Sequence, residues 1–134
     1  MNGMVFVGTD GRPMEKPQRV LVVDDDRDIR ELLGECLHDQ FSVTLAEGGT
    51  EALEAITQEP ERFDALVIDL EMPCMDGAEL IEELRHRHID VPVLIISAVP
   101  DAQARAQQVR AEFISKPFDP SCLQDKVGRL LRAS

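Results

Sequence analysis

Polar side chains that could act on a phosphoryl group follow four short apolar runs of this sequence. They are the acidic run Asp24-Asp25-Asp26, the single Asp69, Ser97 and Lys116. Carboxylates gathered in one pocket repel one another, which raises their pKa values unless a cation joins them. Oxygen ligands of this number suit Mg²⁺, which also coordinates substrate phosphates. A lysine and a hydroxyl beside such a cation could stabilise the charge that develops during phosphoryl transfer.

The runs that precede these residues predict the strands of a parallel sheet. Residues 20–23, 65–68 and 91–96 are nearly unbroken apolar stretches, as expected for central strands that are covered on both faces. Residues 42–46 and 112–115 are weaker, more alternating runs, which suit outer strands of the same sheet. The sequence therefore predicts five strands.

Segments of helical period lie between the strands. Four groups of apolar residues recur at the spacing of one helix face: Ile29, Leu32, Leu33, Cys36 and Leu37; Ala52, Leu53 and Ile56; Leu80, Ile81 and Leu84; and Leu123, Val127, Leu130 and Leu131. Asp119 is the predicted N-cap of the last helix, with Pro120 at its first position. Residues 101–110 are helical by composition but offer only alanines and Val109 as apolar contacts.

Strict alternation of strands and helices predicts an α/β fold with one doubly wound, five-stranded parallel sheet. In such sheets, ligands bind outside the carboxyl ends of the strands, where the strand order reverses. The acidic run, Asp69, Ser97 and Lys116 all follow predicted strands. We therefore expect them at one edge of the sheet.

Composition excludes several classes of function. The chain has 134 residues and a formal net charge of −12, which disfavours direct nucleic-acid binding. Its three cysteines form no C-x-x-C pair, so a disulfide framework or a thiolate zinc site is not expected, and a reducing cytoplasm fits best. No apolar stretch reaches the length of about 18 residues that a membrane span needs, and no basic residues precede the apolar residues 4–7 as in a secretory signal.

The sequence indicates one domain behind a tail. Residues 1–18 are rich in glycine and proline and are predicted to be a flexible tail, and the folded domain is expected at residues 19–134. No repeat and no second domain are evident. The few residues after the last predicted helix are expected to leave no room for an effector domain, although the sequence leaves open whether the chain is a module of a longer protein.

Four separated motifs, in order, resemble the signature of the receiver domains of two-component response regulators. They are Val22-Val23-Asp24-Asp25, the segment Asp69-Leu70-Glu71-Met72-Pro73-Cys74-Met75-Asp76-Gly77, Ser97-Ala98, and Lys116-Pro117-Phe118. The resemblance runs from Val20 to the C-terminus. It implies a flavodoxin-like (βα)5 fold with strand order 2-1-3-4-5, like that of chemotaxis receivers.

The same resemblance implies a role for each site residue. Asp69 would accept the phosphoryl group, and Asp24 and Asp25, together with Asp69 and the main-chain carbonyl of Glu71, would hold Mg²⁺. Lys116 and Ser97 would contact the phosphoryl oxygens, and Ala98 would leave room for the group. Phe113 would be an aromatic switch residue alongside Ser97, and the Lys116-Pro117 peptide bond would be cis.

The implied function is that of a signalling phosphoacceptor, which catalyses only its own phosphorylation and dephosphorylation. The partner would be a sensor histidine kinase or a phosphotransfer protein in the cytoplasm, whose phosphohistidine supplies the phosphoryl group. Phosphorylation would switch a protein-interaction surface. The kinase, the downstream target and the oligomeric state are not encoded in any motif, and neither nucleic acid nor membrane is an expected direct partner.

Two other interpretations remain open from the residues. In a phosphohydrolase of the haloacid dehalogenase type, Asp24 would be the nucleophile, with Asp26, Ser97 and Lys116 completing the site. That interpretation expects Thr or Val where Asp28 stands, lacks a later acidic pair, and leaves Asp69 and its loop unexplained. A pseudo-receiver that binds partners without phosphorylation is the third interpretation, against which the full residue set speaks.

Some features have simpler explanations or depart from the family pattern. Asp24-Asp25-Asp26 could be an acidic cluster at a helix N-terminus, while His86 and His88 are expected to be solvent-exposed near a helix end, and Cys74 has no neighbour that would activate its thiol. The interval from Ser97 to Lys116 is about one helical turn shorter than is usual in receivers. Glu71 and Val99 occupy positions that tune phosphoryl lifetime in the family.

Overall fold

A five-stranded parallel sheet forms the centre of the computed structural model, which describes residues 6–7, 13–14 and 17–133. Its strands are β3 (Arg19–Val23), β4 (Ser42–Ala46), β5 (Ala65–Asp69), β6 (Val93–Ser97) and β7 (Glu112–Ser115). Their order is β4-β3-β5-β6-β7, and every neighbouring pair is parallel. Numbered along the chain within this sheet, the order is 2-1-3-4-5, so the predicted fold is confirmed.

The unbroken apolar runs form the interior strands, as predicted. All residues of β5 and β6 are buried, because helices cover both faces of the sheet. The more alternating runs form the edge strands β4 and β7. β6 begins at Val93 and not at Val91, since Pro92 has no N–H to donate to the ladder, although its carbonyl accepts from Leu66 N at 3.0 Å.

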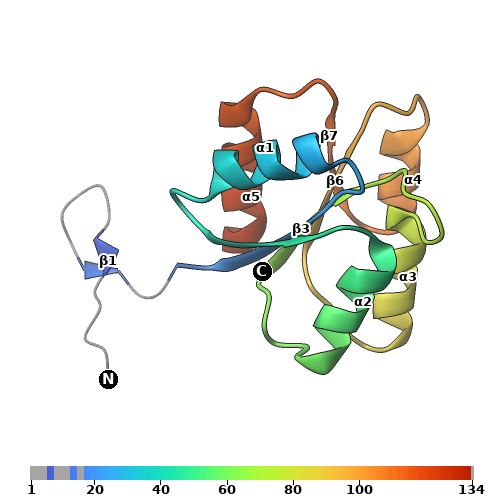
Figure 1. The fold of residues 1–134 in the computed structure, drawn as a ribbon, viewed down its shortest axis with the longest axis horizontal. Helices are drawn as coiled ribbons and strands as arrows, with labels where there is room; N and C mark the ends of the chain where they lie inside the picture. The colour runs from blue at the N-terminus through green and yellow to red at the C-terminus, as the bar shows by residue number, and fades with distance from the viewer. Residues whose placement is uncertain (1–5, 8–12, 15–16, 134) are drawn as a thin grey trace.

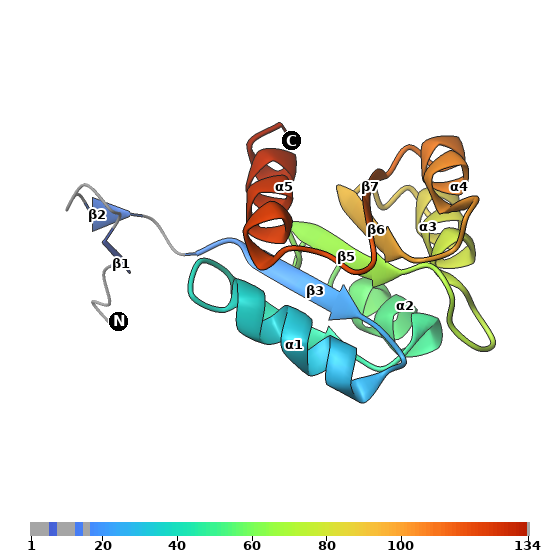
Figure 2. The same cartoon turned by 90° about the horizontal axis from the view of Figure 1, so that it is seen from above.

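Helices cover both faces of the sheet (Figure 1, Figure 2). They are α1 (Arg27–Leu37), α2 (Gly49–Gln58), α3 (Gly77–His86), α4 (Ala102–Gln108) and α5 (Pro120–Ala133). Helices α1 and α5 pack on one face, where Leu33, Leu37, Leu123, Val127 and Leu131 are buried. Helices α2, α3 and α4 pack on the other face through a second apolar cluster. This arrangement leaves the carboxyl ends of the strands as the place where polar groups meet.

The prediction that five apolar residues of α1 share one buried face is wrong for Leu32. Leu33 and Leu37 are buried and Ile29 and Cys36 are partly buried, but the side chain of Leu32 is 44% exposed. Five residues at this spacing form a stripe wider than the surface that the sheet covers. Leu32 therefore lies at the edge of the stripe and faces solvent.

The predicted helix at 101–110 is present but shorter. Helix α4 has seven residues, and its buried residues are Ala102 and Ala106. It ends before Arg110, which adopts a left-handed conformation with φ 58°. This helix therefore contributes only small apolar side chains to the core.

Part of the N-terminal segment also pairs. β1 (Phe6–Val7) and β2 (Pro13–Met14) form a separate two-stranded antiparallel sheet. Just before β3, the carbonyl of Gln18 accepts from Ser42 N of the main sheet at 2.9 Å. The predicted flexibility of residues 1–18 falls largely outside the described residues and stays a prediction. Among the helices of the described part of the chain, none is long and apolar enough to cross a membrane.

Candidate functional site

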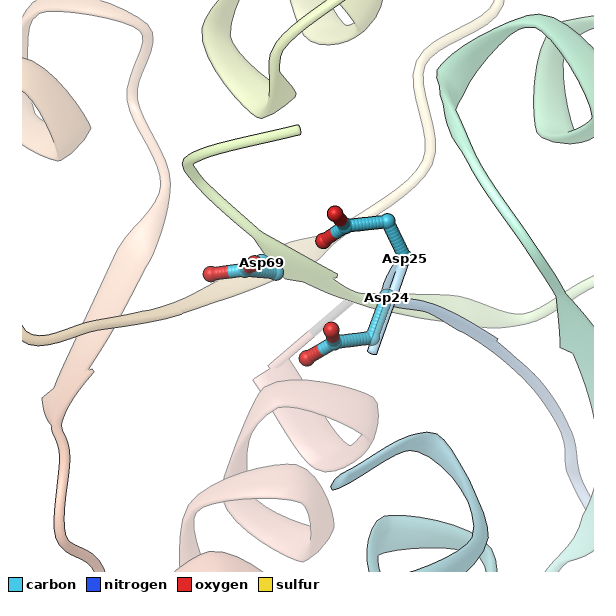
Figure 3. A group of neighbouring side chains, drawn as sticks. All are labelled: Asp24, Asp25 and Asp69. Atoms are coloured by element: carbon cyan, nitrogen blue, oxygen red, sulfur yellow. The ribbon is translucent and has the colours of Figure 1, made fainter. Parts of the chain in front are cut away.

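Three carboxylates converge at the carboxyl edge of the sheet. Asp24 and Asp25 follow β3, and Asp69 is the last residue of β5, its neighbour in the sheet. One oxygen of each lies within 4.8 Å of the others, and Figure 3 shows the three side chains grouped at the ends of β3 and β5. Adjacent parallel strands thus bring together residues that are far apart in the sequence.

Asp24 is fully buried, and only one of its two carboxylate oxygens accepts a hydrogen bond. Its Oδ1 accepts a hydrogen bond from Asp26 N at 2.9 Å. Its Oδ2 is buried without a hydrogen-bond partner, although Lys116 Nζ lies 3.5 Å away as an ion pair. A buried carboxylate oxygen in this state is costly unless a cation or a strong donor completes its shell. Burial raises the pKa of Asp24, in opposition to the Asp26 hydrogen bond and the Lys116 charge.

Asp69 is perturbed more clearly. Burial, reinforced by the negative charge of Asp24, raises its pKa to about 6, while Lys116 partly offsets both effects. Lys116 Nζ donates to Asp69 Oδ1 at 3.3 Å. One ammonium group thus serves two buried carboxylates, so the cluster keeps an excess of negative charge.

This donor set fits a divalent cation. Carboxylate oxygens are the ligands that Mg²⁺ prefers, and it commonly uses one or two of them while keeping waters and a phosphate oxygen as further ligands. The missing hydrogen bond at Asp24 Oδ2 and the raised pKa values of Asp24 and Asp69 are the features that such an ion would relieve. The exposure of Asp25 leaves one side of the cluster open to solvent.

The third residue of the acidic run has a structural role. Asp26 is the N-cap of α1, and its Oδ1 accepts from Asp28 N at 2.9 Å and from Ile29 N at 3.3 Å. Asp26 is therefore an acidic residue at a helix N-terminus, as the simpler explanation of the acidic run expects, whereas Asp24 and Asp25 belong to the carboxylate cluster. Arg30, which belongs to none of the sequence motifs, donates to the main-chain oxygen of Asp24 at 2.9 Å and fixes the start of the acidic run.

Ser97 and Ala98 lie at the end of the strand next to Asp69. Asp69 is in register with Ile96, so Ser97 extends one residue further along β6. The Ser97 side chain is buried, and its Oγ accepts from Val99 N at 3.1 Å. Its carbonyl accepts from Lys116 N at 3.0 Å, which fixes the lysine backbone at the same edge. Ala98 is exposed beside it.

Two further residues predicted for the site, Phe113 and Pro117, lie in β7 and just after it. Phe113 is partly buried and packs against the apolar cluster under α2, α3 and α4. The Lys116-Pro117 peptide bond is cis. Of the other candidates, the side chains of Glu71, Cys74, His86 and His88 are exposed, and nothing in the described structure joins them to the carboxylates.

The loop between Asp69 and α3 is tightly folded. Gly77 N donates to Leu70 O at 2.8 Å, which closes the loop on itself. A Cβ at Gly77 would lie 2.7 Å from the carbonyl oxygen of Asp69, so only glycine fits there without displacing backbone. Cys74 has φ 71°, a left-handed conformation that costs a non-glycine residue about 1 kcal/mol or more. The geometry of this loop is therefore tied to the backbone of Asp69.

The sequence matches the response regulator receiver domain family over residues 20–128. It is 39% identical over 120 residues to the response regulator MprA of Mycolicibacterium vanbaalenii, with 87% of this chain and 51% of the relative covered. It is 40% identical over 118 residues to the response regulator MprA of Mycobacterium avium, with 85% and 51% covered. The chain thus spans about half the length of these relatives.

Solved structures agree in fold. The chemotaxis protein CheY4 of Vibrio cholerae superposes with a TM-score of 0.76 at 30% identity, over 85% of this chain and 98% of that one. The receiver domain of the Francisella response regulator 1452 superposes with a TM-score of 0.79 at 31% identity, over 87% and 98%. Both matches cover nearly the whole of the other chain.

Proposed function

Since the chain belongs to the response regulator receiver domain family of two-component signalling, we propose that it takes a phosphoryl group from a phosphohistidine onto Asp69 with Mg²⁺ and thereby switches a protein-interaction surface. The donor is a sensor histidine kinase or a phosphotransfer protein, and the compartment is the cytoplasm. The observation that carries the proposal is the position of Asp69. It shares a site with two further carboxylates and lies 3.3 Å from the Lys116 ammonium.

The transfer needs Asp69 as a carboxylate. One Asp69 oxygen attacks phosphorus while the bond between phosphorus and the imidazole nitrogen of the donor breaks. The imidazole keeps the electron pair of that bond, and the product is an acyl phosphate. A bound Mg²⁺ supplies charge neutralisation for the carboxylates and for the phosphoryl oxygens. Without a cation, the pKa of about 6 leaves a fraction of Asp69 protonated near neutral pH, which weakens it as a nucleophile.

We propose a role for each of the neighbouring residues. Asp24 and Asp25 hold the cation with Asp69, and the main-chain carbonyl of Glu71 completes the protein ligands. Lys116 stabilises the negative charge that develops on the phosphoryl oxygens. Of the remaining site residues, Ser97 donates a hydrogen bond to the phosphoryl group, Ala98 leaves space for it, and Phe113 responds when Ser97 moves.

Phosphorylation with a small-molecule donor tests the proposal. Incubation with acetyl phosphate and Mg²⁺, followed by intact mass measurement, is expected to add one phosphoryl group to the wild type and none to Asp69→Ala. Label that persists in Asp69→Ala and is lost in Asp24→Ala would instead support the phosphohydrolase interpretation. No label in the wild type, with either acetyl phosphate or phosphorylated histidine kinases, would leave a receiver that binds partners without phosphorylation.

A further inference from the structure

Helix α4 has few attachments of its own. With seven residues it is shorter than the length of about 12 residues at which isolated helices become stable in water. Its N-cap, Asp101, makes no side-chain hydrogen bond to the helix. Its apolar contacts with the sheet are two buried alanines, with Val109 just beyond its end. Other interactions must therefore hold this helix in place.

Two arginines tie α4 to α3, which lies beside it in both views (Figure 1, Figure 2). Near the C-terminal end of both helices, Arg85 of α3 donates to the carbonyl oxygens of Val109 and Arg110. Nearer the carboxyl edge of the sheet, Arg105 of α4 donates to Asp76 Oδ2 at 3.0 Å. The side chains of this second pair are only 33% and 27% exposed, so solvent screens it less than a surface pair.

Asp76 also belongs to the loop that leaves Asp69. Its Oδ1 accepts from Glu79 N at 2.8 Å and its own N–H donates to the Glu79 side chain, so it is the N-cap of α3 in a capping box. The next residue, Gly77, donates to Leu70 O and lies against the Asp69 carbonyl. Because Gly77 is bonded to Leu70, a displacement of Asp76 moves the backbone at both ends of the loop that contains Glu71.

We propose that Arg105 is a positioning residue, which through Asp76 fixes the loop of residues 70–76 and so couples the position of α4 to the carboxylate site. The inference rests on the proposed function in so far as this loop offers the Glu71 carbonyl to a cation. Because coupling between two sites is reciprocal, a partner that displaces α4 also changes the affinity of the carboxylate site for a cation.

Two measurements on Arg105→Gln test the coupling. Amide exchange of residues 103–108 in the metal-free protein is expected to become about three- to fivefold faster, which is the effect of losing a partly buried ion pair. The Mg²⁺ dissociation constant, from a titration followed by the amide NMR signals of residues 69–77, is expected to rise by a similar factor. Arg105→Lys, which retains the charge, is expected to recover at least half of both effects.

Matched variants separate the ion pair from a general loss of structure. Arg87→Gln removes an ion pair of similar length, Arg87 to Glu83 at 2.9 Å on the solvent side of α3, and is expected to change neither measurement. Asp76→Asn keeps an N-cap acceptor but removes the charge. Combined with Arg105→Gln, it is expected to add little to the single variant, because both remove the same interaction.

The outcomes distinguish this inference from the proposed function. Equal Mg²⁺ affinities in wild type and Arg105→Gln would overturn the coupling while leaving the site intact, even if α4 exchanged faster. Unchanged amide exchange would show that the ion pair does not hold α4 and would equally overturn it. Failure of the wild type to bind Mg²⁺ at residues 69–77 would instead contradict the proposed metal site, and with it the coupling.

Discussion

Replacement of Asp69 by Asn is expected to stabilise the metal-free protein at neutral pH. The pKa of Asp69 is about 6 in the folded protein, against 3.8 for an ordinary aspartate. The folded state therefore binds this proton more tightly than the unfolded state does. The associated stability is fully present below about pH 4 and is lost as the pH rises through about 6.

The size of the effect follows from the two pKa values. Their difference corresponds to about 3 kcal/mol, at about 1.4 kcal/mol for each pKa unit. The attraction of Lys116 is already included in the raised value, since it opposes burial and the charge of Asp24. Asn has nearly the same shape and no charge. We therefore expect Asp69→Asn to be about 2–3 kcal/mol more stable than the wild type at pH 7.5, and within about 1 kcal/mol of it at pH 4.

Urea denaturation of metal-free protein at both pH values measures this difference. Asp125→Asn is the matched control, because Asp125 is exposed on α5 and has no described ion pair. It is expected to change the free energy of unfolding by less than about 0.5 kcal/mol at either pH. Equal stability of wild type and Asp69→Asn at pH 7.5, or the same gap at both pH values, would refute the idea that charge crowding at Asp69 determines the pH dependence.

Three further predictions concern the same edge of the sheet. Mg²⁺ at ten times its dissociation constant is expected to raise the melting temperature by about 3–6 °C. In matched thermal melts at equal ionic strength, Asp25→Ala is expected to lose most of that rise. An equal response of wild type and Asp25→Ala would show that Asp25 is not part of the metal site. Ser97→Ala is expected to accept a phosphoryl group yet to lose the phosphorylation-dependent change in amide exchange across residues 98–113, and an unaltered change would exclude a coupling of Ser97 to Phe113. Cys74→Gly is expected to stabilise the protein by about 0.5–1 kcal/mol in urea denaturation, because glycine relieves the left-handed strain at φ 71° but loses more entropy on folding; a destabilised variant would mean that the thiol makes a favourable contact.

Much of the fold was predictable because burial leaves a periodic record in the sequence. The apolar run Ala65–Ile68 has no polar interruption, and all of it is buried in an interior strand. Asp119 was predictable as an N-cap from its position before Pro120, and its Oδ1 accepts from Ser121 N at 2.7 Å. Leu32 was not predictable, since a helical period gives the centre of an apolar stripe but not how far the neighbouring elements cover its edges.

The gathering of Asp24, Asp25, Asp69 and Lys116 at one edge of the sheet was predictable from the sequence, but the geometry of their contacts was not. The sequence alone determined that Asp24, Asp69 and Lys116 lie at the carboxyl ends of strands, since apolar runs end where the polar residues begin. Only the tertiary structure placed the Lys116 ammonium between two carboxylates, at 3.3 Å and 3.5 Å. Parallel strands made this possible because their carboxyl ends share one edge, and burial there then set the pKa values.

Two features could be assigned only from the tertiary structure: the role of Asp26 as a helix cap and the ion pair of Arg105 with Asp76. Asp26 was one of three adjacent aspartates, and only the chain direction after β3 made it a helix cap and left Asp24 and Asp25 at the carboxylate cluster. Arg105 and Asp76 are 29 positions apart and belong to no shared motif. Hydrophobic periodicity and turn preferences depend on residues that are close together in the chain, so they can be recognised in the sequence. Which distant charges meet depends on how two helices lie against each other, and that was decided by the packing of the whole domain.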